Sequence, residues 1–153
     1  MHNDEHYLQH AVALAARNVA DGGRPFGAVL VKDDHVIAEA ANAIHISQDP
    51  TAHAELLAIR SASQILGPRL EGCVIYASGQ PCPMCLSAMY LCGVSRVVYA
   101  ASNSQGEPFG LSTAAIYQQL ALPLNEQKLA VQHLPQPAME AIYRDWKAVH
   151  APR

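Results

Sequence analysis

Two short segments of the chain carry residue types that bind metal ions and move protons. They are His53-Ala54-Glu55 and Pro81-Cys82-Pro83-Met84-Cys85. Each stands where a helix is predicted to begin, and helical side chains lean toward the N-terminus, so groups in two first turns can meet just beyond the helix ends. Cys82 and Cys85 are three residues apart and share one helix face. If the two helix N-termini meet, one imidazole and two thiolates surround a single point.

One nitrogen and two sulfur ligands suit Zn²⁺, and three protein ligands leave the fourth tetrahedral position open, as in catalytic zinc sites. At that position zinc can lower the pKa of a bound water to about 7. Glu55, a carboxylate beside the metal, could accept the proton of this water and deliver it to a substrate nitrogen and then to a leaving amine. We therefore expect one catalytic Zn²⁺ per subunit, with water or hydroxide as its fourth ligand.

Simpler interpretations of the same residues stay open. Cys82 and Cys85 could be buried thiols that pack as small hydrophobic groups, and Glu55 could only stabilise a helix N-terminus. Cys73 and Cys92 are assigned to the core. A structural zinc in a catalytically silent binding module is a third possibility, and it would need a fourth protein ligand such as Cys92, Cys73 or His45.

The elements that must position these residues follow from hydrophobic periodicity and turn residues. A first helix, which Asp21-Gly22-Gly23 ends, is predicted by an apolar stripe through Tyr7, Leu8, Ala11, Val12, Ala15 and Val19. A second helix should begin around Asp49-Pro50-Thr51 and run to about Gln64. Predicted strands are Gly27–Val31, Val36–Ala40, Cys73–Ala77, Arg96–Ala100 and Leu129–Leu134, and further helical runs cover Met84–Cys92, Ala114–Leu120 and Met139–Val149.

This order of elements predicts an α/β fold. The strand–helix–strand succession from residue 73 to residue 100 implies a parallel crossover, whereas the hairpin before it is antiparallel, so the sheet is mixed and has helices on both faces. No repeat or linker-like segment interrupts the 153 residues. We therefore expect a single catalytic domain over residues 1–153 with a central five-stranded mixed sheet.

Composition limits the partners and the location. Only 15% of the residues are charged, against about 25% in typical soluble domains, which favours burial of surface in an oligomer. A net charge of −3 argues against nucleic acid as a partner. The N-terminus, Met1-His2-Asn3-Asp4-Glu5, lacks the basic and apolar runs of a secretory signal, and prolines interrupt the uncharged stretch from residue 72 to 95. We expect a cytoplasmic protein without a membrane span.

A resemblance sharpens the chemical interpretation. A His-x-Glu segment followed by Pro-Cys-x-x-Cys is the signature of zinc-dependent nucleobase deaminases. Over nearly the whole chain, the order of elements resembles the cytidine deaminase-like superfamily, and within it bacterial guanine deaminases most and tRNA adenosine deaminases next. The phrases that carry this resemblance are Pro25-Phe26-Gly27-Ala28-Val29, Asp49-Pro50-Thr51-Ala52-His53-Ala54-Glu55 and Pro81-Cys82-Pro83-Met84-Cys85.

The resemblance implies a three-layer αβα sandwich, usually a homodimer, in which His53, Cys82 and Cys85 hold zinc and Glu55 transfers protons. It also implies substrate contacts. Asn42 would hydrogen-bond the base, Phe26 would wall the pocket, and Ala54 would add a backbone contact. On physical grounds alone, Asn42 could equally be a turn residue, and Phe26, Tyr90 and Leu91 could be core residues.

Departures from the guanine deaminase pattern concern the substrate rather than the chemistry. Those enzymes read the guanine edge with an acidic residue where this chain has Ser112 or Thr113, and they have Trp at the position of Leu91 and Glu at that of Gln80. Thr113 and Leu91 are therefore candidate substrate contacts, and a different or broader base specificity is expected, because a neutral threonine cannot accept two hydrogen bonds as a carboxylate can.

The predicted function is zinc-dependent hydrolytic deamination of a free nucleobase, either a guanine-like purine or a related aminated heterocycle. The alternatives are a tRNA adenosine deaminase, a cytosine or nucleoside deaminase, and the silent structural-zinc module described above.

Overall fold

The structure, a computed structural model, describes residues 3–150 of the chain, so Met1, His2 and residues 151–153 lie outside the described part. A four-stranded mixed sheet forms its centre. The strands are β1 (Gly27–Lys32), β2 (His35–Ala41), β3 (Cys73–Gly79) and β4 (Arg96–Ala101), in the order β2-β1-β3-β4. The predicted antiparallel hairpin of β1 and β2 and the predicted parallel pairing of β3 with β4 are both present, and β1 also pairs antiparallel with β3.

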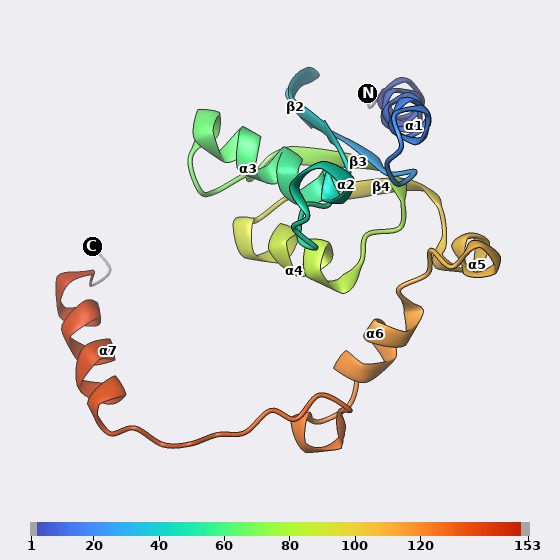
Figure 1. Cartoon of the computed structure of the whole chain (residues 1–153). Helices are drawn as coiled ribbons and strands as arrows, with labels where there is room; N and C mark the ends of the chain where they lie inside the picture. The colour runs from blue at the N-terminus through green and yellow to red at the C-terminus, as the bar shows by residue number, and fades with distance from the viewer. Residues whose placement is uncertain (1–2, 151–153) are drawn as a thin grey trace. The chain divides into compact units, whose positions relative to one another are not determined.

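Helices cover both faces of this sheet (Figure 1). Helix α1 (Asp4–Ala20) packs on one face, against Val29, Val31 and Tyr76. Helices α3 (Ala54–Leu66) and α4 (Pro83–Cys92) pack on the other, around Ala28, Leu30 and Ile75. Because successive side chains of a strand point to opposite faces, β1 is buried on both sides, which explains its continuous apolar sequence.

The predicted fifth strand at Leu129–Leu134 is wrong. The segment has no regular structure, and no strand of the described residues pairs with it. Its side chains are exposed, with Leu129 and Leu134 at 74% and 72%. A β-rich sequence forms a strand only where a neighbouring strand takes up its backbone hydrogen bonds, and Pro135 and Pro137 follow directly.

The second predicted helix begins later than expected. Asp49 and Thr51 form a turn in which Asp49 Oδ1 accepts hydrogen bonds from Thr51 N (2.9 Å) and Thr51 Oγ1 (2.7 Å). This side-chain bonding competes with helix formation, so α3 starts at Ala54. The remaining short helices are α2 (Ile44–Ser47), α5 (Asn103–Gly106), η1 (Glu107–Phe109), α6 (Ala114–Leu120) and η2 (Leu124–Glu126).

Two predictions about which helix residues are buried also need correction. On α1 two residues of the predicted apolar stripe, Val12 and Val19, are exposed at 44% and 52%, whereas the polar Asn18 is buried at 8% exposure. On α4 the core interpretation of Tyr90 and Leu91 fails, because both are 80% exposed. Helix α4 ends at Cys92, and Gly93 follows it as the C-cap residue with a φ of 79°.

The chain divides into two compact units between Gln118 and Gln119. The second unit contains η2 and α7 (Ala138–Val149), whose predicted apolar residues are all exposed; Trp146 stacks on His150 with ring centroids 4.5 Å apart. The single domain expected over residues 1–153 stays a prediction. None of the described helices has the length and apolar character needed to cross a bilayer.

Candidate active site

His53 stands at the residue immediately before α3. Its backbone is extended, with φ −78° and ψ 150°, and it occupies the N-cap position. Two backbone hydrogen bonds hold the segment that leads into α3. Ala43 N donates to Ala52 O (2.9 Å), and His53 N donates to Thr51 O (2.8 Å). The imidazole is thereby presented beyond the N-terminus of α3.

Cys82 occupies the equivalent place on the neighbouring helix. It follows the end of β3, has an extended backbone and is the N-cap of α4, where its Sγ accepts a hydrogen bond from Cys85 N (3.5 Å). Pro83 takes the first helical position, where a missing N–H costs nothing. Cys85 follows in the first turn and is fully buried.

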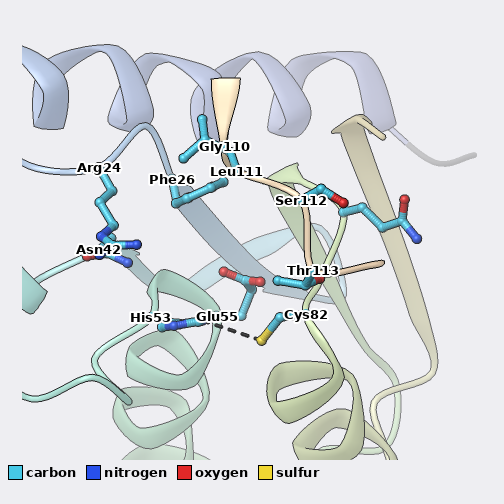
Figure 2. Close-up of a pocket in the computed structure, with 11 residues that line it drawn as sticks. Arg24, Phe26, Asn42, His53, Glu55, Cys82, Gly110, Leu111, Ser112 and Thr113 are labelled. Carbon is cyan, nitrogen blue, oxygen red and sulfur yellow. Dashed lines mark hydrogen bonds between the residues drawn. The ribbon is translucent and has the colours of Figure 1, made fainter. Parts of the chain in front are cut away.

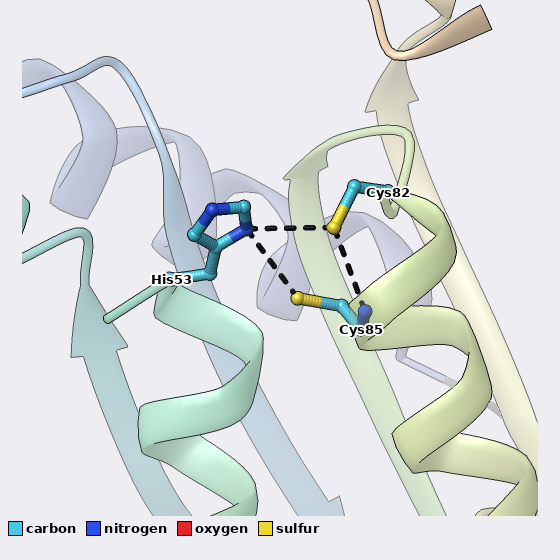
Figure 3. Close-up of side chains that lie close together, drawn as sticks. All are labelled: His53, Cys82 and Cys85. Carbon is cyan, nitrogen blue, oxygen red and sulfur yellow. Dashed lines mark hydrogen bonds between the residues drawn. The ribbon is translucent and has the colours of Figure 1, made fainter. Parts of the chain in front are cut away.

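The two helix beginnings bring His53, Cys82 and Cys85 together (Figure 3). His53 Nδ1 lies 3.5 Å from Cys82 Sγ and 3.6 Å from Cys85 Sγ. These three are the one such group found in the described part of the chain, and their ligand atoms lie within 4.8 Å of one another. Cys73, Cys92 and His45, the candidate fourth ligands of a structural zinc, are not in it.

The donor set fits a zinc ion. Zinc bonds of about 2.0–2.1 Å to nitrogen and about 2.3 Å to sulfur, at a tetrahedral angle, place the two ligand atoms about 3.6 Å apart. The two nitrogen–sulfur distances, 3.5 Å and 3.6 Å, match that value. One imidazole and two thiolates are also the ligand types that zinc prefers.

Electrostatics around the triad favour a thiolate at Cys82. A hydrogen bond from Cys85 and a second from His53 lower the pKa of the Cys82 thiol to about 4. The bond to Cys82 raises the pKa of both His53 and Cys85. The N-terminal end of α4 adds its partial positive charge. A thiolate that exists at neutral pH is the form that binds metal.

Glu55 lies in the first turn of α3, two residues beyond His53. Its side chain is 7% exposed and points into a cavity beside the triad (Figure 2). Burial raises the pKa of its carboxyl above the ordinary value. A buried carboxyl that holds a proton more readily than an exposed one suits an acid–base group.

The cavity next to the triad has a volume of about 150 Å³. It is lined by Arg24, Phe26, Asn42, His53, Glu55, Gln80, Cys82, Gly110, Leu111, Ser112 and Thr113. Of the predicted substrate contacts, Asn42, Phe26 and Thr113 are therefore brought together. The structure does not bring Leu91 to the cavity, because it lies on the exposed side of α4. Ala54 is fully buried and does not line it.

One wall of the cavity is a chain of hydrogen bonds that runs from Gln80 to Thr113. Gln80 Oε1 accepts from Asn103 N (2.9 Å), and Asn103 Oδ1 accepts from Thr113 N (3.2 Å). The Thr113 hydroxyl is buried and has no hydrogen-bond partner within the described residues. A buried hydroxyl without a partner costs free energy.

Sequence reasoning singled out neither Arg24 nor Leu111, and both line the cavity. Arg24 lies between Gly22-Gly23 and Pro25, a context typical of a surface turn, and a single arginine in a turn is no signal of a binding site. Gln80 enters the sequence analysis only as a departure from the pattern of the family that the chain resembles, and it also lines the cavity.

Comparisons with known proteins agree with this geometry. The family described as "Cytidine and deoxycytidylate deaminase zinc-binding region" matches residues 1–101. The guanine deaminase of Bacillus subtilis (strain 168) is 44% identical over 129 residues, which are 83% of each chain. A tRNA-specific adenosine deaminase of Aquifex aeolicus is 40% identical over 102 residues, 66% of this chain and 68% of that one. The crystal structure of the B. subtilis guanine deaminase superposes with a TM-score of 0.91 at 38% identity, covering 99% of this chain and 98% of that one.

Proposed function

Because the chain belongs to the cytidine and deoxycytidylate deaminase zinc-binding family, we propose that it is a zinc-dependent hydrolase that releases ammonia from a free nucleobase. The observation that carries this proposal is the placement of a buried carboxylate, Glu55, in the cavity onto which the triad of His53, Cys82 and Cys85 opens. A carboxylate in such a place has a chemical role that a structural metal site would not need.

The reaction consumes one water and exchanges an amino group for oxygen. A Zn²⁺ bound by the triad supplies a Lewis acid that makes water nucleophilic at neutral pH. Glu55 accepts a proton from the attacking water and passes it to the ring nitrogen beside the carbon under attack. Glu55 then takes the remaining proton of the added water from the hydroxyl on the attacked carbon and passes it to the amino group, the C–N bond breaks, and ammonia leaves while the carbon keeps the oxygen as a carbonyl. Low exposure of Glu55 keeps these transfers away from bulk solvent.

Asn42 and Phe26 orient the heterocycle in this proposal. Asn42 is 2% exposed, and its Oδ1 accepts a hydrogen bond from Ile44 N (3.0 Å), which fixes the amide and leaves Nδ2 to donate to a substrate. Phe26 lines the cavity and provides an apolar surface for the flat ring. These roles are supported by the cavity lining and by the resemblance described above.

A guanine-like purine or a related aminated heterocycle is the proposed substrate class. The B. subtilis relative is a guanine deaminase, whereas the cavity here offers the neutral Thr113 where guanine deaminases of this type are expected to have a carboxylate. Glu55 is the one carboxylate among the described residues that line the cavity. We therefore expect guanine to compete with other aminated rings as a substrate.

A tRNA adenosine deaminase is the second candidate, because tRNA-specific relatives are up to 41% identical over about two thirds of this chain. Binding a tRNA loop requires basic side chains around the pocket. Arg24 is the one basic residue besides His53 that lines the cavity in the described part of the chain, and the net charge is −3. Salt-dependent tRNA binding with a steep negative slope would favour this alternative.

An ammonia-release screen with purified, zinc-loaded protein tests the proposed function. Its panel contains purine and pyrimidine bases, their nucleosides, triazine analogues and tRNA. We expect turnover of at least one free base, and loss of about 10²–10⁴-fold with Glu55→Gln while zinc is retained. The matched control is Glu126→Gln, which removes an exposed carboxylate in the second unit and should leave the rate unchanged. An unchanged rate in Glu55→Gln would refute the mechanism.

We also propose that the protein is a homodimer. The low charged fraction of 15% and the exposure of Tyr90 and Leu91 at 80% each support this proposal, because adjacent large apolar side chains on a surface helix are typical of interaction sites. Light scattering at micromolar concentration checks it, and a strictly monomeric mass would exclude it.

A further inference from the structure

We infer that Arg24 and Asn42 form a subsite for a negatively charged oxygen on the substrate. This inference rests on the proposed function, since it specifies which aminated heterocycles the same cavity accepts. The charged oxygen would be either an ionised oxygen on the ring or a phosphate attached to it through a sugar. Arg24 would then be a specificity-determining residue of the reaction.

The backbones of these two residues are held side by side by one buried side chain. Asn18 Nδ2 donates to Arg24 O (2.8 Å) and to Asn42 O (2.9 Å). Asn18 is 8% exposed and lies in the last turn of α1, so a buried amide joins the loop before β1 to the end of β2. Asn42 N adds a hydrogen bond to Phe26 O (3.0 Å). The position of Arg24 at the cavity is therefore built into the fold.

Gly23 has to be glycine for this arrangement to exist. A Cβ at residue 23 would collide with Asn18 Nδ2 and with the ring of His45. The residue before Arg24 thus packs directly against the amide that holds Arg24 and Asn42 together. Such a close approach of backbone to side chain is available only without a Cβ.

Both side chains on this side of the cavity offer N–H donors to a ligand. The Asn42 amide oxygen is already occupied by Ile44 N–H, which leaves Nδ2. The Arg24 guanidinium has five N–H groups and no acceptor. Figure 2 shows the Arg24 side chain running down to the Asn42 amide, on the opposite side of Glu55 from Thr113. A ligand that meets this side must present acceptor oxygens or nitrogens.

The charge on Arg24 has no protein partner at the cavity. The ion pairs within the described residues do not include Arg24, and no hydrogen bond of its guanidinium is found there. A guanidinium stays charged at every relevant pH, and its hydrogen bonds to anionic oxygens are stronger than those to neutral ones. The cavity therefore favours an anionic ligand over a neutral one of the same shape.

Binding measurements on compounds that have no exocyclic amine test this inference without any turnover. The probes are two matched pairs, namely uric acid, an anion at neutral pH, against neutral hypoxanthine, and inosine 5′-monophosphate against inosine. Each is titrated by calorimetry into zinc-loaded wild type, Arg24→Gln and Arg17→Gln. Arg17 is an exposed residue of α1 that does not line the cavity, so its variant controls for the loss of one positive charge.

We expect wild type to bind the anionic member of one pair at least tenfold more tightly, and Arg24→Gln to lose this preference while Arg17→Gln keeps it. A preference in the first pair identifies a ring oxygen, and one in the second identifies a phosphate. Equal binding of both members of both pairs by wild type, or an undiminished preference in Arg24→Gln, overturns the inference. An Arg24-dependent preference in a protein that releases no ammonia would refute the proposed function alone.

Discussion

Removing the Asn18 amide should weaken the fold and the substrate site together. Asn18→Ala deletes the two hydrogen bonds to Arg24 O and Asn42 O, each contributing about 1 kcal/mol net. Arg24 O still accepts a hydrogen bond from Phe26 N (2.8 Å). Asn42 O loses its side-chain donor in a buried setting, and this unsatisfied acceptor costs about 1 kcal/mol more. Alanine regains about 0.5 kcal/mol of helix propensity. The net loss in free energy of unfolding is about 2.5 kcal/mol.

Thermal unfolding of the zinc-loaded protein, followed by circular dichroism, measures this loss as a drop in Tm of about 5–10 °C. Steady-state kinetics on the best substrate of the screen should show a larger change in KM than in kcat, because the contacts proposed for Arg24 and Asn42 lie away from the reacting carbon. Helix content at 20 °C should match wild type, which separates a local loss from failure to fold.

Two further variants make the test specific. Val19→Ala, at the neighbouring residue, trims a side chain that is 52% exposed and should change stability by less than about 0.5 kcal/mol. Asn18→Asp preserves the size but replaces the donor by a carboxylate facing two carbonyl oxygens, so it should destabilise at least as much as Asn18→Ala. If Asn18→Ala unfolds within 1 °C of wild type with an unchanged KM, the assigned role of this amide is wrong.

Three other outcomes follow from the same geometry. Cys82→Ser should reduce bound zinc, measured by plasma mass spectrometry, to well below one ion per chain, whereas Cys92→Ser, outside the triad, should retain it. Thr113→Asp should raise kcat/KM for guanine about tenfold, since a carboxylate can accept two N–H bonds; a drop for guanine relative to other bases would contradict this. Gly23→Ala should lower Tm by several degrees, because the new methyl collides with Asn18, and an unchanged Tm would show that the contact relaxes freely.

The metal triad could be predicted from sequence because its signal is local. His53, Cys82 and Cys85 stand at the beginnings of helices, and the proline at residue 83 marks one of these beginnings directly. The crossover from β3 through α4 to β4 follows from the order of the segments and from the handedness rules of parallel strands. That the two helix beginnings meet was implied by the resemblance to zinc-dependent nucleobase deaminases, because His53 and Cys82 are 29 residues apart.

The position of Arg24 at the cavity could not be predicted, because it depends on contacts between distant segments. Asn18 looks like a solvent-exposed residue near a helix end, and its role becomes visible only when the turn at Arg24 and the end of β2 meet it. The strand expected at residues 129–134 failed for the related reason that a strand needs a partner, which composition does not reveal.

Both metal-binding segments place a ligand on the N-cap residue, where extended backbone gives way to helix. One residue corresponds to about 100° of rotation about a helix axis. If either helix began one residue early or late, its N-cap ligand would point away from the tetrahedral zinc site. Ion affinity should therefore report how accurately the two helices start, and variants that fray the beginning of α3 or α4 should lose the ion before they lose the sheet.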